Sequence, residues 1–391
     1  MVWRTARRDS LAILRPLLAP AEIPSVNLRG HLPALDAVRG LAIVLVTLYR
    51  FGGGGHGPAT ALADPGLIAL GSRGVDLFFV LSGFLITGIL HDAKGKSHYF
   101  RNFYIRRSLR IFPLYYGVLV LAILILPWLS SAAATAMRPA ATHQAWLWLY
   151  GSNVLQAATG SWPFGPLDHF WSLAVEEHFY LVWPLVIYCT SRTTALRICG
   201  GLAVASLAAR VSWLAAGGND VAAEVFTLLR LDSLAIGAWL ALAARGENGL
   251  AWLVRRAWPT AILSGAALIC QSFVGGRLLG LPPTIWAVFF GSLLVLTLVA
   301  RPNTWRARFG NSAIFRFFGK YSYAMYVFQN LLIPLLAGLV TAPGLAAATG
   351  SVWLGQAIYC GLMFALTTLV ALASWNLFEK HFLTLKSRFG G

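Results

Sequence analysis

The chain has 391 residues, of which 58% are hydrophobic and only 12% are charged. Soluble domains carry about 25% charged residues, so this composition excludes an ordinary soluble fold, and a content of four cysteines excludes a disulfide scaffold. The formal charge of +17 does not indicate a nucleic-acid partner, because the chain has too few polar residues to cover a water-exposed basic fold, which leaves an integral, multi-pass membrane protein.

Ten apolar stretches are long enough for a helix that crosses the hydrocarbon layer, which takes about 17 to 25 residues. None of them alternates as a barrel strand would, so we expect an all-α fold with about ten transmembrane helices. In chain order the stretches are 35–54, 72–90, 111–131, 170–190, 198–216, 225–244, 258–274, 283–300, 321–341 and 351–375. The apolar run within 143–157 is too short to cross, and we expect it to lie in a long outer loop, 132–169.

Basic residues are distributed unevenly between the two sides that ten crossings define. Twenty-four Lys and Arg side chains fall on the side that holds both termini, and three fall on the other side. Positively charged loops stay in the cytoplasm, so we expect both termini to be cytoplasmic. The predicted organisation is a cytoplasmic lead-in at 1–34, a membrane domain at 35–386 and a short cytoplasmic tail at 387–391.

Ionisable side chains in or beside the predicted spans cost about 2.5–3.5 kcal/mol each on insertion scales, so they tend to be paired or functional. Nine of them lie at a similar depth, near the outer ends of the spans: Arg50, Arg73, Asp76, Asp168, Glu176, Glu177, Arg210, Arg230 and Asp232. They predict either one water-filled cavity open to the outer face or a set of structural ion pairs that hold helices together.

Two groups of arginines suggest a route from the cytoplasm to the outer side. Arg39 and Arg50 lie about 16 Å apart on one face of the first span, because eleven residues make close to three helical turns. Arg106, Arg107 and Arg110 precede the third span, where they either anchor it in the cytoplasm or bind a phosphate group together.

Smaller features carry less chemistry. Ser82 is expected to permit close packing of helices rather than to act as a nucleophile. The eight histidines do not fall at the spacing of metal ligands, so no metal site is expected.

Seven short blocks of sequence occur in a recognisable order over nearly the whole chain. They lie at 35–42, 73–87, 104–113, 171–185, 230–238, 319–328 and 374–380. Together they resemble the acyltransferase type 3 family, whose members are integral membrane O-acyltransferases. The ten-helix core of that family agrees with the ten spans expected from hydropathy.

The resemblance implies transfer of an acyl group, commonly acetyl from acetyl-CoA, to a hydroxyl group of an extracytoplasmic glycan. It implies a place in the inner membrane of a bacterium, among lipids and with polysaccharide-assembly proteins as partners. Arg39 matches the family's first motif arginine, and Arg107 and Arg110 match its paired arginines, which are associated with acyl-CoA binding.

Further positions match the family's polar motifs. Glu176 and Glu177 match its acidic pair, and we expect these two residues to act in catalysis with Arg39, Arg50 and His178. The residues that we expect to bind the substrate are Arg73, Asp76, Arg230, Asp232, Tyr326 and Gln329.

The chain departs from the family pattern at two positions where histidine is usual, Arg50 and Gln329. The first of these histidines is taken as catalytic, and a guanidinium group, which stays protonated in proteins, cannot replace it as a base, although it could stabilise an oxyanion.

Three interpretations therefore stay open. In the first, the chain is an acyltransferase whose base is Glu176 or Glu177, or else His178 or His169. In the second, it has the fold without the transferase chemistry and acts as a glycan or lipid transporter or as an accessory protein in envelope polysaccharide assembly. In the third, it transfers a different acyl group or uses an acceptor that is already activated.

Overall fold

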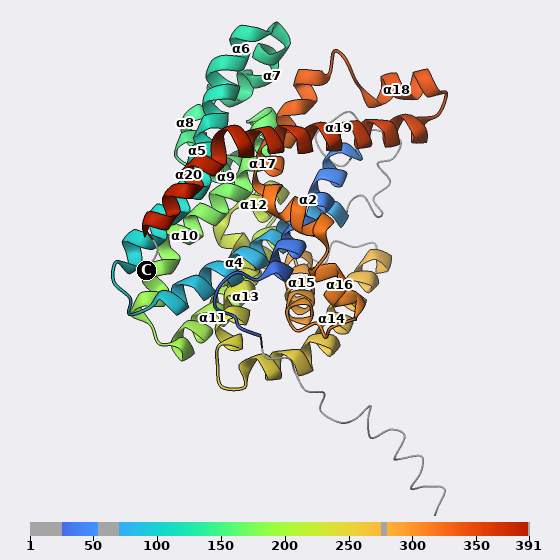
Figure 1. The fold of residues 1–391 in the computed structure, drawn as a ribbon. Helices are drawn as coiled ribbons and strands as arrows, with labels where there is room; N and C mark the ends of the chain where they lie inside the picture. The colour runs from blue at the N-terminus through green and yellow to red at the C-terminus, as the bar shows by residue number, and fades with distance from the viewer. Residues whose placement is uncertain (1–25, 54–69, 275–279, 390–391) are drawn as a thin grey trace, which may run out of the picture.

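The computed structural model describes residues 26–53, 70–274 and 280–389. Their regular structure consists of helices, with no β-strand in these three ranges, which confirms the all-α prediction (Figure 1). Each of the ten predicted spans corresponds to one long helix. These are α2 (Pro33–Phe51), α4 (Gly74–Ala93), α5 (Tyr99–Leu119), α10 (Trp171–Cys189), α11 (Arg192–Ala215), α13 (Thr227–Ala244), α14 (Gly249–Val274), α15 (Pro282–Leu298), α17 (Ala313–Leu336) and α19 (Val352–Ser374).

Five helical stretches of the described chain are both long enough and apolar enough to cross a membrane. They are Gly71–Ala93, Tyr99–Leu129, Arg192–Ala215, Asp220–Ala244 and Val352–Thr384. Helix α15 is apolar but shorter, and α2 and α10 carry ionisable residues, which lower their hydropathy. The count of ten crossings therefore stays a prediction.

Short helices connect the long ones. Stretch 143–157 contains α8 and most of α9, which are too short to cross, and the predicted outer loop 132–169 around them is also largely helical. The short elements are η1 (Gly71–Arg73), η2 (Val120–Ile125), α6 (Leu126–Leu129), α7 (Ser131–Thr142), α8 (Gln144–Trp148), α9 (Ser152–Thr159), η3 (Gly165–Phe170), α12 (Asp220–Val225), α16 (Trp305–Gly310), α18 (Ala342–Thr349), η4 (Trp375–Glu379), α20 (Lys380–Thr384) and η5 (Leu385–Phe389).

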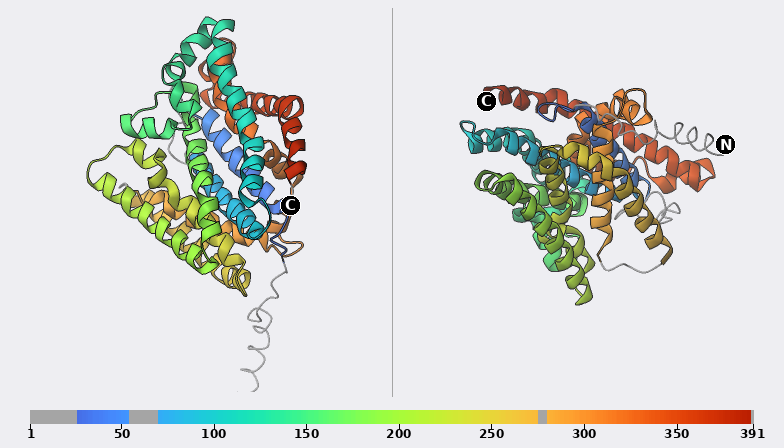
Figure 2. Two further views of the ribbon diagram at one scale, coloured as in Figure 1. Left: turned by 90° about the vertical axis from the view of Figure 1, so that its left-hand side faces the viewer. Right: turned by 90° about the horizontal axis from the view of Figure 1, so that it is seen from below.

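Glycines let two pairs of helices approach closely in the interior. A Cβ atom at Gly40 of α2 would lie 1.8 Å from the carbonyl oxygen of Phe315 in α17, and one at Gly83 of α4 would lie 2.0 Å from that of Leu234 in α13. Such contacts place backbone against backbone, as small residues do between membrane helices. Both views of Figure 2, in which α2 is blue, show this helix near the middle of the bundle.

Loops that were predicted to share a side lie together. At one end of the bundle, Arg245 donates to the carbonyl oxygen of Leu28 at 3.1 Å and to Asp92 Oδ2 at 2.7 Å. At the other end, Gln356 Nε2 donates to the carbonyl oxygen of Phe51 at 2.5 Å. These contacts agree with the predicted order of the loops, while the assignment of the first end to the cytoplasm stays a prediction.

Candidate functional site

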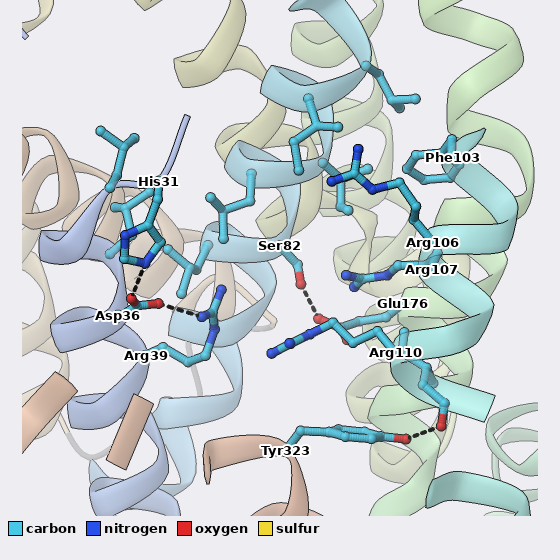
Figure 3. A pocket seen from close by; sticks show the side chains of 18 of the residues that line it. His31, Asp36, Arg39, Ser82, Phe103, Arg106, Arg107, Arg110, Glu176 and Tyr323 are labelled. Carbon is cyan, nitrogen blue, oxygen red and sulfur yellow. Dashed lines mark hydrogen bonds and ion pairs between the residues drawn. The ribbon is translucent and has the colours of Figure 1, made fainter. Parts of the chain in front are cut away.

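A cavity of about 1210 Å³, here called the central cavity, lies between the long helices α2, α4, α5, α10 and α17 (Figure 3). The C-terminal segment, residues 375–389, forms a further part of its wall. Its lining includes nine cationic side chains from the described residues: Arg29, Arg39, Lys96, Arg106, Arg107, Arg110, Arg316, Lys320 and Lys386. Three carboxylates share the same lining: Asp36, Asp92 and Glu176. Most of these cations belong to segments predicted to be cytoplasmic. The excess of positive charge favours a ligand with several negative charges that enters from that side.

The three arginines of α5 all line the central cavity, because positions 106, 107 and 110 fall within one turn of the helix. The guanidinium group of Arg107 lies over the ring of Tyr180, 3.9 Å from its centroid. Its Nε atom is buried and has no hydrogen-bond partner within the described part of the chain. The structure thus places the predicted phosphate-binding residues on one wall of the cavity, with donor capacity to spare.

Arg39 lies on the opposite wall, where two neighbours orient it. Asp36 Oδ1 accepts a hydrogen bond of 3.0 Å from Arg39 Nη1, and Asp36 Oδ2 lies 2.6 Å from His31 Nε2. Figure 3 shows the guanidinium groups of Arg39 and Arg110 approaching each other across the cavity. Two cations that face each other across a cavity form a natural place for an anionic group.

Glu176 is the acidic residue of α10 that reaches the central cavity. Ser82 Oγ of α4 donates to Glu176 Oε1 at 2.5 Å and lies 2.8 Å from the hydroxyl oxygen of Tyr180. Ser82 also lines the cavity, so its hydroxyl group has a role in addition to the helix packing expected from the sequence. The close approach of helices is made by its neighbour Gly83, which frees the Ser82 hydroxyl to hold a carboxylate.

The next two residues of α10 point elsewhere, because successive residues of a helix are rotated by about 100°. The Glu177 side chain lies outside the cavity lining, and its Oε1 atom is buried with no hydrogen-bond partner among the described residues. His178 Nδ1 lies 2.7 Å from Thr227 Oγ1, which also accepts a hydrogen bond of 2.7 Å from Asn153. Of the three adjacent candidates, the geometry therefore favours Glu176 for contact with a ligand in the cavity.

Tyr326 and Ser172 close the cavity toward the predicted outer side. Their hydroxyl oxygens lie 2.5 Å apart, and Tyr326 also donates to the carbonyl oxygen of His169 at 2.8 Å. The imidazole of His169 is 3% exposed, and its Nδ1 atom lies 3.0 Å from Asn330 Nδ2. Its Nε2 atom has no hydrogen-bond partner in the ranges that the structure describes. A buried imidazole with a free nitrogen thus lies directly behind Tyr326.

Arg50 acts on this imidazole through its charge. Burial lowers the pKa of His169 to about 3, and the positive charge of Arg50 contributes to the same direction. Burial raises the pKa of Asp168 to about 6, while hydrogen bonds and the charge of Arg50 oppose that rise. Arg50 lies outside the lining of the central cavity, so the two arginines of α2 do not share one chamber.

Gln329, the other position predicted to depart from the family pattern, is fully buried between α17 and α2. Its Oε1 atom accepts a hydrogen bond of 3.3 Å from Thr47 Oγ1. Its amide nitrogen has no hydrogen-bond partner within the described chain. Gln329 lies outside the lining of the central cavity, so its predicted contact with substrate stays a prediction.

Four of the predicted substrate-binding residues take part in ion pairs. Arg230 of α13 forms an ion pair with Asp76 of α4, whose second oxygen lies 3.6 Å from Arg73. Asp232 accepts a hydrogen bond of 2.7 Å from Arg210 Nη2 and one of 2.5 Å from Thr284.

These pairs lie outside the lining of the central cavity and connect α13 to α4 and to α11. The nine charges near the outer ends therefore do not form one chamber: five of them form ion pairs, and four of these five connect different helices. A role of Arg73, Asp76, Arg230 or Asp232 in binding substrate stays a prediction that this pairing does not support. The described residues contain no group of three or more His, Cys, Asp or Glu side chains that could hold a metal ion.

Comparison with known proteins connects this arrangement to one class of enzyme. The family model described as an acyltransferase domain matches residues 32–373. The chain is 26% identical over 369 residues to the peptidoglycan O-acetyltransferase OatA of Listeria monocytogenes, covering 90% of this chain and 56% of that protein.

Two further relatives carry similar names. A putative O-acetyltransferase of Staphylococcus aureus is 26% identical over 333 residues, covering 78% of this chain and 51% of that protein. The putative peptidoglycan O-acetyltransferase YrhL of Bacillus subtilis is 30% identical over 222 residues, covering 54% of this chain and 33% of that protein. The chain thus spans about half the length of the first of these curated relatives. No solved structure matches the chain.

Proposed function

Because the chain belongs to this acyltransferase family and is an integral membrane protein, we propose that it transfers an acyl group, acetyl in the first place, from cytoplasmic acyl-CoA to a hydroxyl group of an extracytoplasmic glycan. The names of the Listeria and Bacillus relatives make peptidoglycan the first acceptor to test. The proposed setting is the inner membrane of a bacterium, with both termini in the cytoplasm.

The observation that carries this proposal is the central cavity itself. Cationic side chains surround its entrance on the predicted cytoplasmic side, here called the mouth. The carboxylate of Glu176, which accepts a hydrogen bond from Ser82, lies on the same lining. Acyl-CoA combines several phosphate charges with a neutral thioester arm, so the charge distribution of the cavity fits this donor. The unused Nε donor of Arg107, the facing cations Arg39 and Arg110, and the apolar walls supplied by Phe78 and Phe79 support the same fit.

We assign the base to Glu176. Its carboxylate would accept the proton of the attacking acceptor hydroxyl while the new ester C–O bond forms and the thioester C–S bond breaks. The proton would then pass to the departing thiolate, which leaves Glu176 ionised for the next turnover. Ser82 and Tyr180 orient the carboxylate, and the guanidinium group of Arg107 lies nearby. Arg39, on the wall opposite Arg110, could stabilise the oxyanion that develops on the thioester carbonyl.

A second candidate base is His169, because its imidazole is neutral and one of its nitrogens is unused. It lies behind Tyr326, so it would reach the acceptor from the outer side of the cavity. His169→Gln should therefore retain most activity if Glu176 is the base, and should abolish activity if the imidazole is.

The test is acyl transfer by the full chain reconstituted in lipid vesicles, with radiolabelled acetyl-CoA and soluble muropeptides. We expect ester formation that Glu176→Gln reduces by about a hundredfold or more and that Glu177→Gln changes less. Absence of transfer from acetyl-CoA to muropeptides, and to capsular or lipopolysaccharide glycans as alternative acceptors, would contradict the proposal. Glycan binding without any transfer would favour an accessory or transport role.

A further inference from the structure

The C-terminal segment forms one wall of the cavity mouth. Elements η4, α20 and η5 all pack against α5, and Figure 1 shows α20 running beside α5. Trp375 of η4 and Lys386 of η5 both line the central cavity. This segment therefore adds a third side to a mouth whose other sides come from α2 and α5.

Lys386 lies in an unbalanced electrostatic environment. The side chain is half-buried and faces Arg106, Arg107 and Arg110 of α5, whose charges act on it directly. The carboxylate of Glu379 acts on Arg110 and accepts a hydrogen bond of 3.0 Å from Ser374. Further charged or titratable groups on the packed elements and across the mouth are Lys380, His381, Arg388, Arg29, His31, Asp36, Arg39, Asp92, Lys96, Glu176, Arg316 and Lys320.

This environment destabilises the protonated form of Lys386. Burial lowers the pKa of Lys386 to about 7, and the charges of Arg110, Arg107 and Arg106 act in the same direction. Near neutral pH the ammonium group is therefore only partly protonated as long as no anion is bound. An anion placed among these cations would remove the repulsion and favour the protonated form.

Resting on the proposed function, we propose that Lys386 is a ligand for the phosphate groups of the acyl donor and that it takes up a proton when the donor binds. Arg106 and Arg110 hold the phosphates from the α5 side, and Lys386 holds them from the C-terminal segment. Ligands on two elements surround a polyphosphate, whereas arginines on one helix contact it from one side only. Lys386 would thus help the protein to distinguish a nucleotide-linked thioester from a simpler thioester without phosphates.

The direction of the pH dependence follows from linkage. The free-state pKa of Lys386 is lowered to about 7, and donor binding raises it, so binding takes up a proton at and above that pH. Donor affinity is then highest below pH 7 and decreases as the pH rises. If only the protonated form binds well, affinity falls by about tenfold between pH 7 and pH 8.5.

Calorimetric titration of the full chain in phosphatidylcholine nanodiscs with acetyl-CoA tests the proposal. We expect wild-type affinity to fall by about tenfold between pH 7.0 and 8.5. Lys386→Arg should bind with little pH dependence, because a guanidinium group does not titrate in this range. Lys386→Met should bind about tenfold more weakly at pH 7.0 and also without pH dependence. Lys380→Met is the matched control, since Lys380 is exposed on the adjacent α20, and it should behave like wild type.

Proton uptake gives an independent readout. Titrations at pH 8.0 in buffers with different ionisation enthalpies should show uptake by the wild type and by Lys380→Met, and markedly less by Lys386→Arg. Equal affinity and equal proton uptake in wild type and Lys386→Met would overturn the proposal. A melting temperature unchanged by each substitution would show that the variants are folded.

Two further arms separate the sources of phosphate. Acetyl-CoA binding that is unaffected by Lys386→Met, together with phosphatidylglycerol inhibition that this substitution abolishes, would assign Lys386 to a lipid headgroup and overturn the proposal. A short-chain acyl pantetheine thioester, which lacks phosphates, should bind equally weakly to wild type and Lys386→Met. If the wild type binds no acetyl-CoA at any pH, the proposed function fails together with this inference. If it binds acetyl-CoA without dependence on Lys386, only the inference fails.

Discussion

The clustered charges of this protein fall into two regions that differ both in burial and in balance. In the first region, α13 pairs Arg230 with Asp76 and Asp232 with Arg210, and each carboxylate has a guanidinium partner. In the second, the central cavity, nine cations share the lining with three carboxylates. In an ion pair the two side chains neutralise each other and connect their helices. An excess of positive charge, by contrast, must be balanced by a ligand or by solvent. A charge imbalance is therefore a better indication of a binding site than the presence of charged residues.

The largest effect on stability should come from breaking a pair in the balanced region. Asp232→Asn would leave the guanidinium group of Arg210, which is 1% exposed, without its carboxylate. We expect a loss of about 3–5 kcal/mol in the free energy of unfolding, because an uncompensated buried charge is costly. Thermal unfolding in detergent measures this loss, with Asp220→Asn at an exposed position as the control.

The same pair offers a way to separate stability from chemistry. The double substitution Arg210→Met with Asp232→Leu removes both charges and should recover most of the stability that Asp232→Asn loses. If these residues only hold helices together, the recovered protein also regains acyl transfer. A stable double variant that is inactive would instead support the predicted substrate role of Asp232 and would weaken the contrast between the two regions.

In the unbalanced region, Glu176→Gln should affect turnover and leave the fold intact. We expect a decrease in kcat of about a hundredfold or more, since an amide cannot accept the proton of the acceptor hydroxyl. The melting temperature should change little, because glutamine still accepts a hydrogen bond from Ser82. Ser82→Ala should reduce kcat by a smaller factor, because it removes only the group that orients the carboxylate. A reversed order of the two effects would contradict the assigned base.

Arg110 tests whether the cavity mouth binds the donor. We expect Arg110→Met to raise the KM for acyl-CoA by about tenfold to a hundredfold and to change kcat less, because a charged hydrogen bond to phosphate contributes about 1.5–3 kcal/mol. Arg197→Met is the matched control, since Arg197 is an exposed residue on the same predicted side. Equal effects of the two substitutions would favour the alternative that the α5 arginines only anchor the chain in the cytoplasm.

The sequence predicts the long helices and most of the cationic residues at the entrance of the central cavity, but it does not predict which buried charges form ion pairs. The ten long helices were predicted because the length of an apolar stretch is written directly in the sequence. Arg110 and Glu176 were predicted through their motifs, but Glu177 was an equally good candidate and His178 a second choice. The rotation of α10 decides which of the three faces the cavity, and that rotation depends on packing against other helices.

Other site residues were missed because their partners are distant in sequence. Lys386 was assigned no role because only the fold brings the C-terminal segment onto α5. Ser82 was taken as a packing residue, because its carboxylate partner Glu176 lies 94 residues away in the sequence. The nine outer charges left two interpretations open, since their sequence positions gave depth but not partners.

The smallest expected effect concerns Arg50, which belongs to neither region because it does not line the central cavity. Its charge helps to keep His169 neutral and lowers the cost of ionising Asp168. Arg50→Gln should therefore raise the pKa of both groups. At pH 7 the ionised Asp168 carboxylate then lowers the free energy of unfolding further, because its charge is no longer balanced by Arg50. At pH 4.5 Asp168 is protonated, so this cost disappears, and His169 accepts a proton more easily.

The stability of Arg50→Gln relative to wild type should thus improve as the pH falls from 7 to 4.5, by about 1 kcal/mol or less. Unfolding midpoints at the two pH values measure this change, with Arg138→Gln at an exposed outer position as the control. A relative stability that does not change with pH would mean that Arg50 does not act on these two groups. An arginine at position 50, where the resemblance leads us to expect histidine, would then need an explanation in catalysis itself, which the activity of Arg50→His would provide.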